Sequence, residues 1–181
     1  TAGGGTILFE NTGAGGVSFG AVSTTGDGSP LNGEDDITLS SDGGDLTITT
    51  SVTADGDGDV ILNTTNAGNV ILTGTTTAAG HEVTVNSVGS ISGAGLVTAA
   101  TVDLNAATGI VANLAASTIT ADNSTSGDVD IDNALAGAVT VSSLTTAGGG
   151  TILFENTGAG GVRVGTGTPP DASRPPDGED D

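Results

Sequence analysis

The seventeen residues TAGGGTILFENTGAGGV occupy positions 1–17 and occur again, unchanged, at positions 146–162. The tail keeps the same offset of 145 residues, because its closing GEDD at residues 178–181 matches GEDD at residues 33–36. Long internal repeats are typical of repeat architectures, in which each unit contacts its neighbours along the chain. We therefore expect residues 1–145 to form one unit and residues 146–181 to begin the next.

A shorter rhythm runs inside the unit. A turn-type residue, an apolar residue, any residue and a second apolar residue recur as DITL, DVIL, EVTV and DVDI, which begin at Asp36, Asp59, Glu82 and Asp128. The first three starts are 23 residues apart, and the fourth follows at twice that distance. Alternation of apolar and polar residues predicts strands with one buried face, and the Gly, Asn and Asp between them favour tight corners.

Strands with this register predict an all-β fold, a parallel β-solenoid (β-helix) with coils of about 23 residues. Residues 1–145 would form about six coils with a loop at residues 23–35, and residues 146–181 would continue the same solenoid. Ile37, Val60 and Val83 should then lie in one interior row. A tandem of β-sandwich domains is the alternative, although a sandwich gives no reason for a 23-residue register.

Residues 90–121, SISGAGLVTAATVDLNAATGIVANLAASTITA, do not follow the register. The next start is expected at Asn105, but TVDL begins four residues earlier, at Thr101. We expect strands with redistributed corner lengths here. A short helix through the alanines is the alternative, which closely spaced Val, Thr and Gly disfavour.

The charge is strongly one-sided. The chain has 22 acidic residues against two basic ones, Arg163 and Arg174, and a net charge of −20. So acidic a surface repels nucleic acid, which excludes it as a partner. No apolar stretch reaches the roughly 18 residues of a membrane helix, and the first residues do not resemble a signal peptide, so we expect no membrane insertion of this segment.

Three carboxylates alternate with glycines in TADGDGDV, at Asp55, Asp57 and Asp59. Oxygen ligands of this kind suit Ca²⁺, so these residues are the candidate metal site and calcium is the one cofactor considered. The EF-hand pattern is incomplete, because Asn66 stands where a bidentate Glu is needed. The alternative interpretation is that these are corner residues whose side chains bond to the backbone.

Two other function classes are disfavoured. A β-helix carbohydrate-active enzyme would need basic side chains to stabilise an anionic intermediate, and residues 1–162 contain none, so we expect no enzymatic activity. An ice-binding solenoid would need paired threonines at one place in every coil, and the TxT spacing does not recur in the 23-residue register.

The stretches GDGDVILNTTNAGNVILTGTTTAAG (residues 56–80) and VNSVGSISGAGLVTAATVDLNAATGIVANL (residues 85–114) resemble the repeats of large bacterial surface proteins of the filamentous haemagglutinin and autotransporter-passenger kind. The resemblance implies a non-catalytic, extracellular filament, adhesin shaft or biofilm-matrix fibre on a bacterial surface. Further copies of the unit, stacked end to end or in tandem, would be its partners, together with a host or neighbouring-cell surface. A calcium-binding surface or matrix protein is the alternative function.

Overall fold

The computed structural model describes residues 5–26 and 35–165. Most of the expected loop at residues 23–35, and the second unit beyond residue 165, lie outside these ranges. The described residues form strands and corners without a helix, and every strand pairing among them is parallel. The all-β prediction is therefore confirmed, and the alternative of a short helix within residues 90–121 is wrong.

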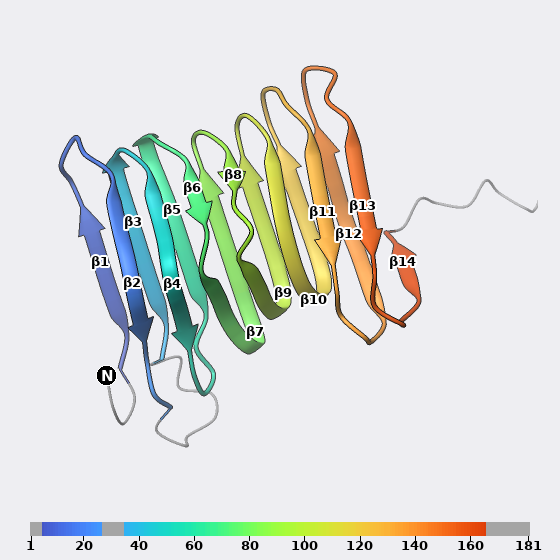
Figure 1. Cartoon of the computed structure of the whole chain (residues 1–181), viewed down its shortest axis with the longest axis horizontal. Helices are drawn as coiled ribbons and strands as arrows, with labels where there is room; N and C mark the ends of the chain where they lie inside the picture. Colours follow the sequence, from blue (N-terminus) through green and yellow to red (C-terminus); the bar gives the residue numbers. More distant parts are fainter. Residues whose placement is uncertain (1–4, 27–34, 166–181) are drawn as a thin grey trace, which may run out of the picture.

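The strands succeed one another along the longest axis in the order of the sequence (Figure 1). Their bounds are β1 Ile7–Asn11, β2 Val17–Ser23, β3 Ile37–Gly43, β4 Leu46–Ala54, β5 Val60–Ala67, β6 Val70–Leu72, β7 Thr75–Ser87, β8 Ile91–Ser92, β9 Leu96–Ala106, β10 Ile110–Asn123, β11 Val129–Asn133, β12 Val139–Thr146, β13 Ile152–Asn156 and β14 Val162–Val164.

The pairings arrange the strand segments in three rows, of which the third is formed by the end of β2, the end of β4, the starts of β7 and β9 and the middle of β10. The first row runs β1, β3, β5, the last halves of β7, β9 and β10, then β12 and β14. The second row runs β2, β4, β6, β8, the start of β10, then β11 and β13. The chain passes from one row to the next at each corner, so segments that pair within a row lie one circuit apart in the sequence.

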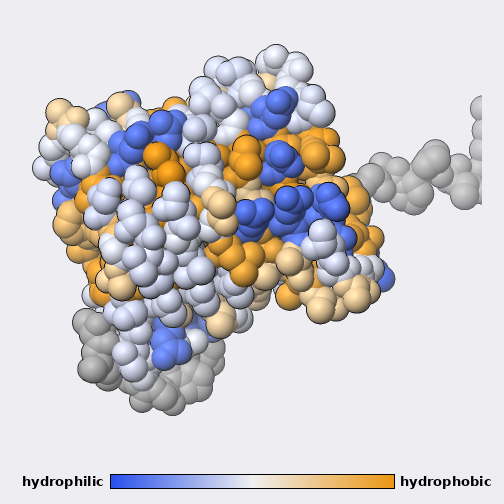
Figure 2. All heavy atoms as spheres, in the orientation of Figure 1, coloured by the Kyte–Doolittle hydropathy of each residue, from blue (hydrophilic) through white to orange (hydrophobic). Residues whose placement is uncertain are grey.

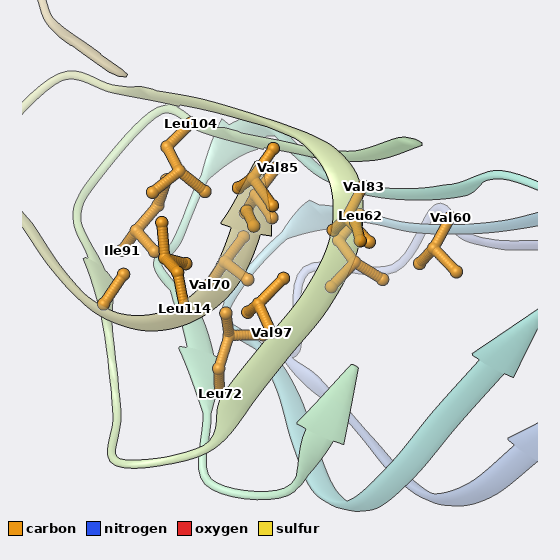
Figure 3. Close-up of a cluster of buried hydrophobic side chains, with 14 of the residues drawn as sticks. Val60, Leu62, Val70, Leu72, Val83, Val85, Ile91, Val97, Leu104 and Leu114 are labelled. Carbon is orange, nitrogen blue, oxygen red and sulfur yellow. The ribbon is translucent and has the colours of Figure 1, made fainter. Parts of the chain in front are cut away.

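The core lies inside the three rows. Ile37 pairs with Val60 and Val60 with Val83, and all three side chains are fully buried. This is the interior row that the 23-residue spacing predicts. Inward side chains of the second row, such as Val70 and Ile91, belong to the same apolar cluster (Figure 3). One continuous core therefore joins the rows.

The pairing step changes along the first row. From Ile37 to Val60 to Val83 the step is 23 residues, as it is for the side-chain bonds that join Asp36, Asp59 and Glu82. Val83 then pairs with Val102 and Val102 with Ile119, so the step falls to 19 and then 17. As a result Val129 pairs with Ile110 in the second row. The expectation that Asp128 stays in line with Glu82 is therefore wrong.

β7, β9 and β10 each pass from the third row into the first row without leaving strand conformation. Residues 79–81 form the bend of β7, which lies within a 23-residue step, whereas Ala100 and Ser117 alone form the bends of β9 and β10 within the shorter steps. A column of small buried residues lines the inside of these bends, formed by Ala54, Ala78, Ala99 and Ala116. Alanine suits this place because a larger side chain would occupy the space that the facing row fills.

Candidate functional site

The candidate metal residues lie in the corner between β4 and β5. Asp55 is exposed, and one of its carboxylate oxygens accepts a hydrogen bond of 2.9 Å from the backbone N–H of Gly56. Its other oxygen accepts one of 3.5 Å from the N–H of Gly26. Asp57 and Asp59 are half-buried. The corner thus brings the three residues together, while the Asp55 carboxylate is engaged with backbone donors.

Asp59 belongs to a ladder of carboxylates that links successive strands of the first row. The Asp36 carboxylate accepts the N–H of Asp59 at 2.9 Å, and the Asp59 carboxylate accepts the N–H of Glu82 at 2.9 Å. In the second row, the Asp128 carboxylate accepts the N–H of Thr151 at 2.7 Å. Each carboxylate therefore bonds the backbone of the next strand in its row, where the corner interrupts regular pairing.

A related ladder joins the starts of β4, β6 and β8 in the second row. The Asp45 carboxylate accepts the N–H of Asn69 at 2.8 Å, and the side-chain oxygen of Asn69 accepts the N–H of Ser90 at 2.9 Å. Carboxylates and amides thus serve the same purpose. Among the residues that the structure describes, no group of three or more His, Cys, Asp or Glu is placed to hold a metal ion. Calcium binding by Asp55, Asp57 and Asp59 stays a prediction.

The structure shows a corner motif that the sequence analysis did not identify. An inward polar residue at the end of a strand donates to the carbonyl oxygen of a glycine four residues later. Asn11 donates to Gly15 at 2.6 Å, Thr64 to Gly68 at 3.2 Å and Asn123 to Gly127 at 2.7 Å. The sequence signal is Asn or Thr followed at the fourth position by Gly, directly after an apolar alternation. This bond closes a tight corner over a buried polar group.

The outward face of the first row carries a ladder of amides. Asn86 donates to the side-chain oxygen of Asn63 at 2.8 Å, and Asn105 donates to that of Asn86 at 3.1 Å. Next to it lies a shallow depression of about 170 Å³, lined by polar residues such as Asn86, Asn105 and Asp122 together with Val88 and Ala106. The ladder uses its own amide groups to link strands along the row, so its chemistry is structural.

Threonine pairs stack over part of one face. Ser51 and Thr53 of β4 lie beside Thr75 and Thr77 of β7. The spacing of these pairs is slightly longer than the 23-residue register, which is why that register does not reveal them. The array ends at β9, where Leu96 lies beyond the position of Thr75.

Most of the large exposed apolar side chains gather at the two ends of the rows. Leu8 is 74% exposed in β1, Leu153 is 55% exposed in β13 and Val164 is 78% exposed in β14. Figure 2 shows apolar surface at the right-hand end, where β13 and β14 lie. Within the described ranges, one edge of β1 and one edge of β13 have no paired strand. These edges expose backbone groups that another strand could pair with.

Comparisons with protein-family models, with curated protein sequences and with solved structures found no match. None of the described residues forms a helix long and apolar enough to cross a membrane.

Proposed function

We propose that the rows are the walls of a parallel β-solenoid, with coils of about 23 residues in its regular part, and that the protein is a structural extracellular filament or adhesin shaft. The observation that carries the proposal is the pairing pattern. Strands pair with the strand one circuit ahead and one circuit behind, and both ends leave an edge open. A fold that adds strands along one axis can be lengthened by adding units.

Several features support a structural role. The carboxylate and amide ladders bond one strand to the next along each row, so polar side chains reinforce the long axis. Repetition of one sequence at residues 1–17 and 146–162 suits a rod that is extended and does not suit a single unique cleft. The charge of −20 keeps such a rod soluble and away from polyanions.

Location and partners follow from the resemblance to bacterial surface repeats. The filament would stand on a bacterial surface or in a secreted matrix. Further copies of the unit would be its first partners, and a host or neighbouring cell surface its target. In this proposal the Asp59 carboxylate has a structural role of its own, because it accepts the backbone N–H of Glu82.

The length of multi-unit arrays tests the proposal. Residues 1–145 would be repeated once, twice or three times ahead of residues 146–181, and the products measured by negative-stain electron microscopy. Each added unit should lengthen an unbranched rod by about 30 Å, since it adds slightly more than six circuits and parallel strands stack at about 4.8 Å. Beads joined by linkers, or particles that widen without lengthening, would overturn the proposal.

A further inference from the structure

The two copies of the repeated stretch lie in different rows. In the first copy, Ile7–Asn11 belongs to the first row and pairs with Ile37–Ser41 ahead of it. In the second copy, Ile152–Asn156 belongs to the second row and pairs with Val129–Asn133 behind it. The same side chains face the core in both copies, since Ile7 pairs with buried Ile37 and Ile152 with buried Val129. This sequence therefore fits either row. The first copy is paired along the edge that faces the following strand, and the second copy along the edge that faces the preceding strand.

The offset between the two copies corresponds to six and a half circuits of the proposed solenoid, where six were expected. The first row advances six times from β1 to β12, and half a circuit then leads to β13 in the second row. This passage from the first row to the second is what we call a half circuit, and successive units of the repeat are rotated about the long axis by it, a rotation that we call the half turn.

The same half circuit shapes the two ends. The first row contains eight described strand segments and the second row seven. At the end that carries β14, the second row is thus one strand shorter. A second molecule that begins with β1 continues both rows without a gap only if β1 enters the second row.

We infer that copies of this chain stack end to end with a half-turn rotation, so that β1 of one copy pairs with β13 of the next and β2 pairs with β14. This inference rests on the proposed solenoid. The contact places Ile7 opposite Ile152, Asn11 opposite Asn156 and Val17 opposite Val162. The corner at residues 11–16 then lies on its own twin at residues 156–161.

The glycines of the twin corners show that the space for this contact exists. A Cβ on Gly160 would overlap the carbonyl oxygen of Gly137 in the corner behind it. The equivalent Gly15 has nothing within 4 Å of the place of its Cβ. Gly20 and its equivalent Gly165 differ in the same way, since a Cβ on Gly165 would lie 2.5 Å from the carbonyl oxygen of Ser142. The open side of Gly15 and Gly20 is the side on which a second copy would pack.

Apolar surface favours the contact and charge opposes it. Docking would cover Leu8 and Phe9 at one end and Leu153 and Val164 at the other, all of which are exposed in the single chain. Two molecules that each carry −20 repel one another at low ionic strength. Salt screens this repulsion, with a Debye length of about 3 Å at 1 M. Association should therefore strengthen as salt is added.

Disulfide cross-linking tests the rotation, because the chain has no cysteine of its own. Opposed residues on paired strands lie about 4.8 Å apart, within the Cα separation of about 4.4–6.8 Å that a disulfide requires. A full-length Arg163→Cys variant would be mixed in 1 M NaCl with a Ser18→Cys or a Thr6→Cys variant and oxidised. The half turn places Ser18 opposite Arg163, whereas stacking without rotation places Thr6 opposite Arg163.

The Ser18→Cys mixture should yield the cross-linked heterodimer and the Thr6→Cys mixture should not. The reverse result would overturn the half turn while leaving the rod of the proposed function intact. Failure of both mixtures, with a monomer by sedimentation, would overturn end-to-end docking. Multi-unit arrays would still elongate in either case, so the two proposals fail separately.

Glycine variants give a second readout on the same mixture. Gly15→Ala should abolish the cross-link and leave the melting temperature of the single chain unchanged, since its Cβ meets nothing in this chain. Gly137→Ala is the matched control, because its Cβ would make only an ordinary contact of 3.7 Å with Leu135 and its corner is already covered by Gly160 of the same chain. An undiminished cross-link in Gly15→Ala would show that this corner does not form the contact.

Discussion

Between Ile37 and Val83 the first row advances by 23 residues per strand, whereas between Val83 and Ile119 it advances by 19 and then 17. Both regions have fully buried apolar columns and parallel pairing. They differ at their corners. In the regular region residues 55–59 form a loop between β4 and β5 and residues 79–81 form the bend of β7, whereas in the short region Ala100 and Ser117 alone form the bends of β9 and β10.

Corner length, and not strand length, therefore sets the register of this chain. With bends of one residue at Ala100 and Ser117, the short region contains an additional half circuit between Val83 and Val129. That half circuit moves the second copy of ILFEN to the second row. The short bends of β9 and β10 thus determine how whole units are oriented.

The largest expected effect tests whether the two regions share one core. Leu62 and Leu104 occupy the same interior column, one in each region, and both are fully buried. Leu62→Ala and Leu104→Ala should each lower the free energy of unfolding by about 2–5 kcal/mol. Urea denaturation would measure both. Leu8→Ala is the control, since Leu8 is 74% exposed. If Leu104→Ala lowered the free energy of unfolding no more than Leu8→Ala does, the two regions would not share one core.

A smaller effect is expected at the bend that distinguishes the short region. Ala116 is fully buried on the inside of the bend, while its neighbour Ala115 is only half-buried. Ala116→Leu should cost about 1–3 kcal/mol, because a larger side chain would have to displace the packed core. Ala115→Leu is the matched control and should change stability by less than about 0.5 kcal/mol. If thermal or urea unfolding showed the same loss of stability for Ala116→Leu and Ala115→Leu, the proposed packing inside the bend would be contradicted.

A comparable or smaller effect is expected from the carboxylate ladder of the regular region. Asp59→Ala removes the acceptor for the N–H of Glu82 and should cost about 1–2 kcal/mol. Asp59→Asn retains an acceptor oxygen and should recover most of this loss. If Asn were as damaging as Ala, the negative charge itself, and not the hydrogen bond, would be the stabilising feature.

Strand type, burial and the regular register could be predicted from the sequence, because alternation and spacing report directly on which residues face a core. Ile37, Val60 and Val83 show this. The row to which a strand belongs could not be predicted. ILFEN fits both rows with the same inward residues, so its own pattern carries no information about the choice.

The corner carboxylates show a similar limit. Asp36, Asp59 and Asp128 could be placed at corners from their positions before apolar alternations. Their hydrogen bonds to the next strand depend on which strands are adjacent in a row. Because of the extra half circuit, Asp128 accepts from Thr151 in the second row and is not part of the first-row ladder of Asp36 and Asp59. The alanines at the bends occur in the sequence as pairs, Ala78–Ala79, Ala99–Ala100 and Ala115–Ala116. Because alanine also favours a helix, these pairs could not be recognised as bends.

The smallest expected effect is that of calcium. The Asp55 and Asp59 carboxylates accept backbone hydrogen bonds, so the regular region needs no ion to hold its corner. The melting temperature should be the same in EDTA and in millimolar CaCl₂ at constant ionic strength. If the melting temperature were higher in CaCl₂ than in EDTA, and a combined Asp55→Asn and Asp57→Asn variant lost this difference, the alternative of a calcium-binding surface protein would be established.

The pairing of β11 decides between the two registers most directly. The structure sets Asp130 opposite Val111, whereas an unbroken 23-residue register would set it opposite Ala107. Two full-length double variants, Val111→Cys with Asp130→Cys and Ala107→Cys with Asp130→Cys, would be oxidised at low concentration and mapped by mass spectrometry. We predict an intramolecular disulfide in the first variant and none in the second. A disulfide in the second variant alone would contradict the extra half circuit and, with it, the placement of the two repeats in different rows.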